Sequence, residues 1–136
     1  MFMKRIIVLV LFSAVMVSCI DYHEEPRYDY RERIIGSYAV EEYSETYDEY
    51  VYYDIFLSKD YGTSDGIYFE NFYADGVSVY AYFNNDRITI PFQVTDGYEI
   101  EGHGIYNRGE FDLHYSVRDR YSNSITDYCD TYAYRE

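Results

Sequence analysis

The sequence predicts an all-β fold, an eight-stranded antiparallel up-and-down meander barrel that follows an N-terminal signal peptide. From Ile35 onward, nearly every segment is rich in Tyr, Val, Ile and Phe, and apolar residues recur at every second position. That is the period of a half-buried strand. Short turn signals break these segments at regular intervals, and none of the segments shows the apolar period of a helix.

The composition limits the classes of protein to consider. The chain has 136 residues, enough for one domain. Its 25 acidic residues outnumber its 11 Lys and Arg, so the net charge is -14. We expect no nucleic-acid partner, because so acidic a chain repels phosphate backbones. The aromatic content of 21% argues against disorder, since acidic disordered chains are poor in aromatic residues.

Residues 1–18 predict a secretory signal peptide. Lys4 and Arg5 precede an apolar run over residues 6–17. As a helix this run would reach only about 18 Å, short of a bilayer core of about 30 Å. Ser18 then supplies the small residue of a cleavage site.

Cys19 follows directly, and Met16-Val17-Ser18-Cys19 resembles a bacterial lipoprotein box. The resemblance implies that Cys19 becomes the lipidated first residue of the mature protein. The membrane would then be a partner through a lipid anchor, and the protein would lie in the cell envelope, at the outer membrane. An ordinary signal peptide followed by an incidental cysteine is the alternative.

Residues 19–34 are predicted to form the lipidated cysteine and a charged tether. The segment contains Pro26, is highly charged and has no apolar period. Asp21, Glu24 and Glu25 resemble the acidic export signals of surface-exposed lipoproteins in Bacteroidetes-type bacteria. A solvated linker that faces the periplasm is the alternative. With Cys19 acylated, Cys129 has no partner for a disulfide, and its strand-like context predicts a small buried apolar residue.

Residues 35–136 form the predicted barrel domain. The connections between its segments are short, so consecutive strands must pair antiparallel. Closure into a barrel removes exposed strand edges, whereas a two-sheet sandwich usually needs longer crossovers. The expected strands cover residues 35–45, 49–58, 66–73, 77–84, 87–94, 98–106, 110–118 and 124–135.

Three turns predict the register of the second half of the domain. We expect a two-residue loop at Asn84-Asn85, a three-residue loop at Thr95-Asp96-Gly97 and a hairpin closed by Asn107-Arg108. All three keep one face apolar, and a one-residue slip would place that face in water. The expected cross-strand pairs are Phe83 with Asp86, Phe92 with Ile100, Gly102 with Leu113 and Gly104 with Phe111.

Several short motifs carry a family resemblance. Gly36-Ser37-Tyr38 is similar to the Gly-x-Trp start of lipocalins, with Tyr in place of Trp. Residues 67–73, 88–93 and 100–104 resemble small lipocalin-like (calycin-like) lipoproteins of Bacteroidetes, and the similarity covers roughly residues 35–135. The resemblance implies a calyx that binds small apolar molecules, and it brings no catalytic residues.

The interior of such a barrel is the first candidate site, since inward residues line the mouth of a calyx. The alternation of inward and outward positions along each strand places Phe92, Gly102 and Gly104 on the inward face, together with the candidate ligand-binding residues. The alternative is that these large side chains simply fill a narrow barrel. The candidate ligand-binding residues are Tyr38, Val40, Val51, Tyr53, Phe69, Phe83, Ile90 and Tyr115.

The outer face carries a weaker candidate, a metal site. The expected register sets His103 opposite Asp112 and Glu101 opposite His114, and imidazole with carboxylate suits zinc. Cross-strand charge pairs on a solvated sheet are the more ordinary interpretation, so we expect neither a metal nor another cofactor. An acidic cluster around the first turn, expected as a solvated loop, comprises Glu41, Glu42, Glu45, Asp48 and Glu49.

Two functional hypotheses follow, neither of them enzymatic, since the chain contains no phosphate loop, nucleophile elbow or zincin motif. The first is a lipid-anchored barrel that binds a small apolar or aromatic ligand in its mouth. The second is a filled barrel that binds a protein or glycan through a Tyr-rich exterior. The tyrosines expected on the outer face are Tyr43, Tyr50, Tyr52, Tyr80, Tyr82, Tyr128, Tyr132 and Tyr134.

Overall fold

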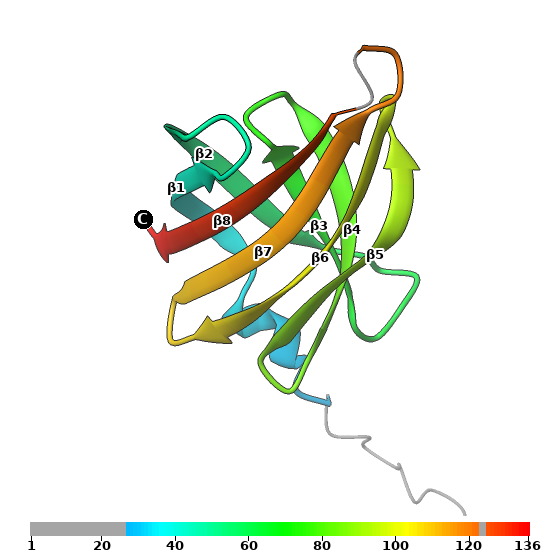
Figure 1. The fold of residues 1–136 in the computed structure, drawn as a ribbon. Coiled ribbons are helices and arrows are strands. Elements are labelled where there is room, and N and C mark those ends of the chain that lie inside the picture. Colours follow the sequence, from blue (N-terminus) through cyan, green and yellow to red (C-terminus); the bar gives the residue numbers. More distant parts are fainter. Residues whose placement is uncertain (1–26, 123–124) are drawn as a thin grey trace, which may run out of the picture.

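The computed structural model describes residues 27–122 and 125–136 as a closed eight-stranded barrel (Figure 1). Each strand pairs antiparallel with the next, and β8 pairs with β1. Within these residues, no helix is long and apolar enough to cross a bilayer. The elements are the 3-10 helix η1 (Tyr30–Arg33), β1 (Gly36–Ser44), β2 (Glu49–Lys59), β3 (Gly66–Phe72), β4 (Val77–Asn84), β5 (Arg87–Thr95), β6 (Tyr98–Asn107), β7 (Glu110–Asp119) and β8 (Thr126–Arg135).

The predicted fold class is confirmed, and every strand begins and ends within two residues of its predicted bounds. Period-two alternation predicts the strands well because one face of each strand is buried. In β4, for example, Val77, Val79, Ala81 and Phe83 are all at most 1% exposed.

Two of the predicted turns are wrong by one position. The two-residue turns are Asn85-Asp86 and Arg108-Gly109, and all four residues have positive φ angles, as the type I′ turn of a tight hairpin requires. The predicted partners of Phe83 and Gly102 are therefore wrong. Phe83 pairs with Ile88, and Gly102 pairs with Tyr115. Each register shift is two residues, so the apolar face is preserved.

The turn between β5 and β6 is also shorter than predicted. Asp96-Gly97 closes it as a two-residue turn, and Thr95 pairs with Tyr98. The extra residue instead forms a bulge between Ile90 and Gln93. Pro91 lies in this bulge, where a missing N–H breaks no ladder hydrogen bond. Phe92 is consequently 63% exposed rather than inward-facing, which corrects the prediction.

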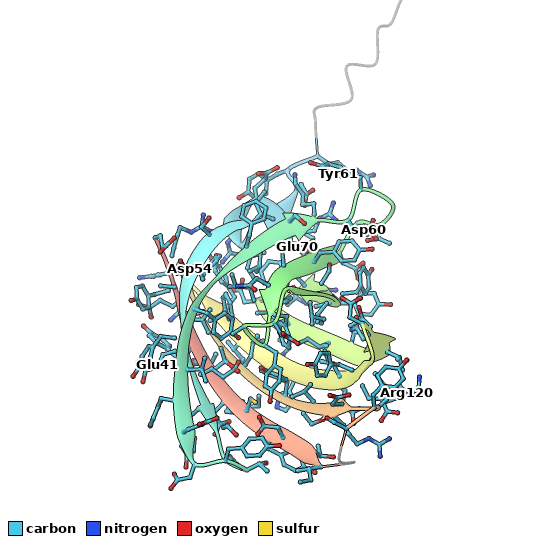
Figure 2. The ribbon with its side chains drawn as sticks, turned by 90° about the horizontal axis from the view of Figure 1, so that it is seen from above. Glu41, Asp54, Asp60, Tyr61, Glu70 and Arg120 are labelled. Carbon is cyan, nitrogen blue, oxygen red and sulfur yellow. The ribbon has the colours of Figure 1, made fainter. Side chains whose placement is uncertain are left out.

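The interior of the barrel is filled. Figure 2 shows side chains crowded inside the ring of strands, whereas Glu41 and Asp54 lie at its outer side. Gly102 and Gly104 leave no space, because Tyr115 and Leu113 occupy it: a Cβ at Gly104 would lie 2.1 Å from the Asp112 carbonyl oxygen. The largest fully buried side chains are Tyr38, Phe69, Phe72, Phe83, Phe111, Ile34, Leu57, Ile67, Ile88, Ile90, Ile100 and Leu113.

The two ends of the barrel differ. At the closed end, drawn at the bottom of Figure 1, η1 packs under the strands. Ile34 is fully buried and its carbonyl accepts a hydrogen bond from the Tyr38 hydroxyl at 2.7 Å. The buried Arg31 guanidinium donates to the carbonyls of Asp60 (2.7 Å) and Gly66 (2.8 Å). The open end, at the top, is surrounded by the β1–β2, β3–β4, β5–β6 and β7–β8 loops.

Cys129 is a free, buried thiol, 2% exposed, as its strand-like context predicted. Burial raises the pKa of this thiol well above its ordinary value, so it is an unreactive packing residue. Cys19 and the rest of the predicted signal peptide and lipoprotein box lie outside the described residues.

Candidate functional site

The open end holds a cavity of about 180 Å³, which we call the mouth cavity. Three tyrosine rings and two carboxylates line it, and within residues 27–122 and 125–136 no Lys or Arg does. They come from the β1–β2, β3–β4 and β7–β8 loops and from β6, β7 and β8. The described residues that line the cavity are Tyr47, Tyr73, Tyr98, Val117, Asp119, Ser122, Ile125 and Asp127.

Asp127 is the buried carboxylate of the mouth cavity, only 3% exposed. Its two oxygens accept hydrogen bonds from the Ser44 hydroxyl (2.5 Å) and the Tyr73 hydroxyl (2.7 Å). Hydroxyl donors satisfy a buried carboxylate without neutralising its charge. One side of the cavity is therefore lined by a carboxyl group that only neutral hydroxyl donors hold.

A second buried carboxylate belongs to Glu42 on β1. It is also 3% exposed, and it is not among the described residues that line the mouth cavity. Its Oε2 atom accepts from the hydroxyls of Tyr115 (2.6 Å), Tyr53 (2.7 Å) and Thr131 (3.1 Å). Burial raises the pKa of Glu42 above its usual value, and the three hydroxyl donors oppose that rise. The carboxyl group of Glu42 is therefore expected to take up a proton more readily than an exposed glutamate.

Tyr73 reaches the mouth cavity by an unusual backbone conformation. Its φ is +58° and that of Ala74 is +51°, a region that costs a bulky residue about 1–3 kcal/mol. The conformation brings the Tyr73 hydroxyl to Asp127 and its ring to 6.0 Å from that of Tyr98. The Tyr98 hydroxyl donates to Asp75 at 2.5 Å, and this bond raises the pKa of Tyr98 to about 12. These tyrosines are accordingly neutral and held in place.

None of the residues predicted to bind a ligand is among the described residues that line the mouth cavity. Tyr53 is half-buried and bonds to Glu42, while Val51 is 36% exposed on β2 beside the first turn. The other six are packed in the core, none of them more than 4% exposed: Tyr38, Val40, Phe69, Phe83, Ile90 and Tyr115.

Sequence reasoning missed the polar residues of the open end. Glu42 was expected in a solvated loop, and its burial corrects that expectation. The sequence did contain a signal for this burial. Glu42 lies an even number of positions from Tyr38 and Val40 in the same strand, and Asp127 lies two positions from Cys129, so each is expected on the inward face. Tyr47 and Tyr73 lie in turns, where strand alternation does not predict which way a side chain points.

On the outer face, the predicted tyrosines do point outward: six of the eight are at least 40% exposed, and Tyr43 and Tyr80 are half-buried. The predicted imidazole–carboxylate pairs are wrong, because the turn before β7 lies one residue later than expected. His103 pairs with His114, Glu101 with Ser116, and Asp112 with Ile105. In the described part of the chain, no three His, Cys, Asp or Glu residues are grouped as metal ligands would be.

Comparison with known proteins bears on the fold only. No family model matches the chain, and no curated protein matches it. A solved structure of a redesigned beta barrel, b11L5F_LGL, superposes with a TM-score of 0.55 at 9% sequence identity, over 79% of this chain and 96% of that one. At so low an identity, this likeness supports the β-barrel architecture and carries no function across.

Proposed function

We propose that this protein is a non-catalytic, lipid-anchored cell-envelope barrel that binds a small organic cation in its mouth cavity. The observation that carries the proposal is the lining of that cavity: three tyrosine rings and two carboxylates, with no Lys or Arg among the described lining residues. Aromatic faces and carboxylates both attract cations, and a ring of them in a partly dry site is the usual receptor for an ammonium group.

The size of the cavity limits the ligand. A cavity of about 150 Å³ is enough to hold a molecule such as benzene, and the mouth cavity measures about 180 Å³. It therefore suits an ammonium head group rather than a long acyl chain. The filled core beneath it favours a polar head group over the apolar ligand expected from the sequence.

Binding in the mouth cavity is tested by isothermal titration with choline and with 3,3-dimethylbutan-1-ol, which has the same shape and no charge. We expect choline to bind and the neutral analogue to bind at least tenfold more weakly. Tyr47→Ala should abolish choline binding. Tyr61→Ala, which removes an 89% exposed ring of the β2–β3 loop, is the control and should leave it unchanged. Equal binding of the two probes would reject the cation, and binding of neither would reject the site.

The anchor is a separate part of the proposal, supported by the lipoprotein box at Cys19, by the charged tether and by the resemblance to lipocalin-like lipoproteins. Radiolabelled palmitate should be incorporated into the protein in a bacterial host and be absent from a Cys19→Ala variant. Equal labelling of both proteins would reject the anchor. Exposure at the cell surface, rather than toward the periplasm, would be checked by protease treatment of whole cells.

A further inference from the structure

A hollow on the outside of the barrel is separate from the mouth cavity. It has a volume of about 450 Å³ and runs over the outward side of β6, β7 and β8, with the buried residues Ile90, Tyr115 and Cys129 beneath it. The side chains that line it, besides those residues and Gly102, are Glu45, Glu101, His103, His114, Ser116, Tyr128 and Asp130.

A smaller hollow of about 150 Å³ continues this surface across β8 onto β1 and β2, because both hollows are lined by His114 and Asp130. We call the two together the outer groove. It crosses five neighbouring strands, about 19 Å at a spacing of about 4.8 Å per strand. The further residues that line it are Glu41, Tyr43, Tyr50, Asp112, Thr131 and Tyr132.

The charge of the outer groove is one-sided. Five carboxylates line it, and no Lys or Arg of the described part of the chain does. The carboxylates of Glu45 and Asp130 lie close enough for a shared hydrogen bond, which raises the pKa of Glu45. One of them, Asp130, has a hydrogen bond with the Nδ1 atom of His114. The five are Glu41, Glu45, Glu101, Asp112 and Asp130.

Tyrosine rings line the outer groove together with these carboxylates. Tyr50 and Tyr128 are 59% and 55% exposed, and Tyr132 is 40% exposed. The rings of Tyr43 and Tyr50 lie 4.9 Å apart, and the Tyr43 hydroxyl is held by Asp48 at 2.8 Å. Exposed tyrosines beside carboxylates match a guanidinium group, which stacks on a ring and bonds to a carboxylate at once.

We infer that the outer groove binds an extended, arginine-bearing segment of a partner protein. Alternate side chains of an extended peptide point the same way about 7 Å apart, so a segment of about 19 Å offers three groups to the groove. Charge complementarity favours this partner over a neutral glycan, which would gain little from five carboxylates. The inference goes beyond the proposed function, because none of the residues of the groove lines the mouth cavity.

The test uses a fluorescein-labelled octapeptide of alternating Arg and Ser, titrated with the full chain and followed by fluorescence anisotropy. We expect saturable binding that the Glu101→Gln/Asp130→Asn double variant weakens at least tenfold. Tyr132→Ala should weaken it about threefold to tenfold. Circular dichroism and thermal unfolding would establish that both variants fold.

The matched control is Asp54→Asn/Glu70→Gln, which makes the same change in net charge at two labelled positions of β2 and β3 that do not line the outer groove (Figure 2). It should weaken binding less than twofold. Equal weakening by both double variants would overturn the inference, since the peptide would then respond only to overall charge. No peptide binding, or saturable binding of maltohexaose in its place, would also overturn it. Tyr47→Ala should leave peptide binding intact, which separates this result from failure of the mouth cavity.

Discussion

The two ends of the barrel bury charge in opposite ways. At the closed end the buried group is a cation: the Arg31 guanidinium bonds to two backbone carbonyls and to Asp29. At the open end the buried groups are the carboxyl groups of Glu42 and Asp127, which accept hydrogen bonds from hydroxyls and have no Lys or Arg partner among the residues that the structure describes. The buried cation of the closed end thus has a carboxylate partner, whereas the buried carboxyl groups of the open end are held by neutral hydroxyls.

This difference separates what holds the barrel together from what faces a ligand. Arg31 donates to two carbonyls at the ends of the β2–β3 connection and ties the η1 cap to them, which is a stabilising use of a buried charge. Carboxylates held by neutral donors stay costly to bury. The open end, which retains two such carboxyl groups, is therefore suited to binding a ligand. Four sets of variants test whether the closed end serves stability and the open end serves binding.

Tyr38→Ala at the closed end should have the largest effect on stability. Tyr38 is fully buried, its ring lies 4.9 Å from that of Phe111, and its hydroxyl bonds to Ile34. We expect the free energy of unfolding in urea to fall by about 3–5 kcal/mol. Tyr61→Ala, an exposed tyrosine of the neighbouring loop, should change it by less than about 0.5 kcal/mol. Similar losses in both variants would contradict the packing argument.

Tyr73→Phe tests the buried hydrogen bond at the open end. The change removes the hydroxyl that donates to Asp127, keeps the ring, and should lower the free energy of unfolding by about 1.5–3 kcal/mol. Tyr43→Phe removes the same kind of bond to Asp48 on the solvent side and should cost less than about 1 kcal/mol. Equal losses of unfolding free energy in the two variants would contradict the prediction, and would indicate that water reaches Asp127.

Glu42→Gln should change how stability depends on pH. Because burial raises the pKa of Glu42 above 4.5, the native state holds this proton more tightly than the unfolded state does. The stability of the parent protein relative to the variant should thus be highest below pH 4.5 and fall as the pH rises through the interval up to the native pKa. The slope cannot exceed about 1.4 kcal/mol per pH unit. Urea titrations between pH 4 and pH 8 measure it, and a difference that grows with pH would show that the hydroxyl donors outweigh burial.

Tyr47→Ala should have the smallest effect on stability. Its side chain is 52% exposed at the rim of the mouth cavity, so we expect a change of less than about 0.5 kcal/mol in the free energy of unfolding. The variant should nevertheless lose choline binding. A large loss of stability would mean that this ring belongs to the core, and that the open end is not specialised for a ligand.

The amino-acid sequence alone predicted the architecture, for a local reason. Alternation and turn residues act within a few positions of each other, so they specify strands such as β4 and connections such as that between β6 and β7 to within two residues. Local signals also determined which face each side chain lies on. The turn at Arg108-Gly109 lies one residue later than predicted, and the resulting two-residue change of register moved no side chain from one face to the other. The burial of Cys129 followed from the same pattern.

Only the tertiary structure decided the chemistry of the two candidate sites. Glu42 is satisfied by Tyr115, 73 residues away, and Ser44 meets Asp127 across 83 residues. No local pattern records such partners. The bulge at Pro91 that turns Phe92 outward likewise depends on pairing with β6. Barrel closure brings distant strands side by side. The polar groups that meet there line the open end with tyrosines and carboxylates, where the sequence predicted an apolar cup.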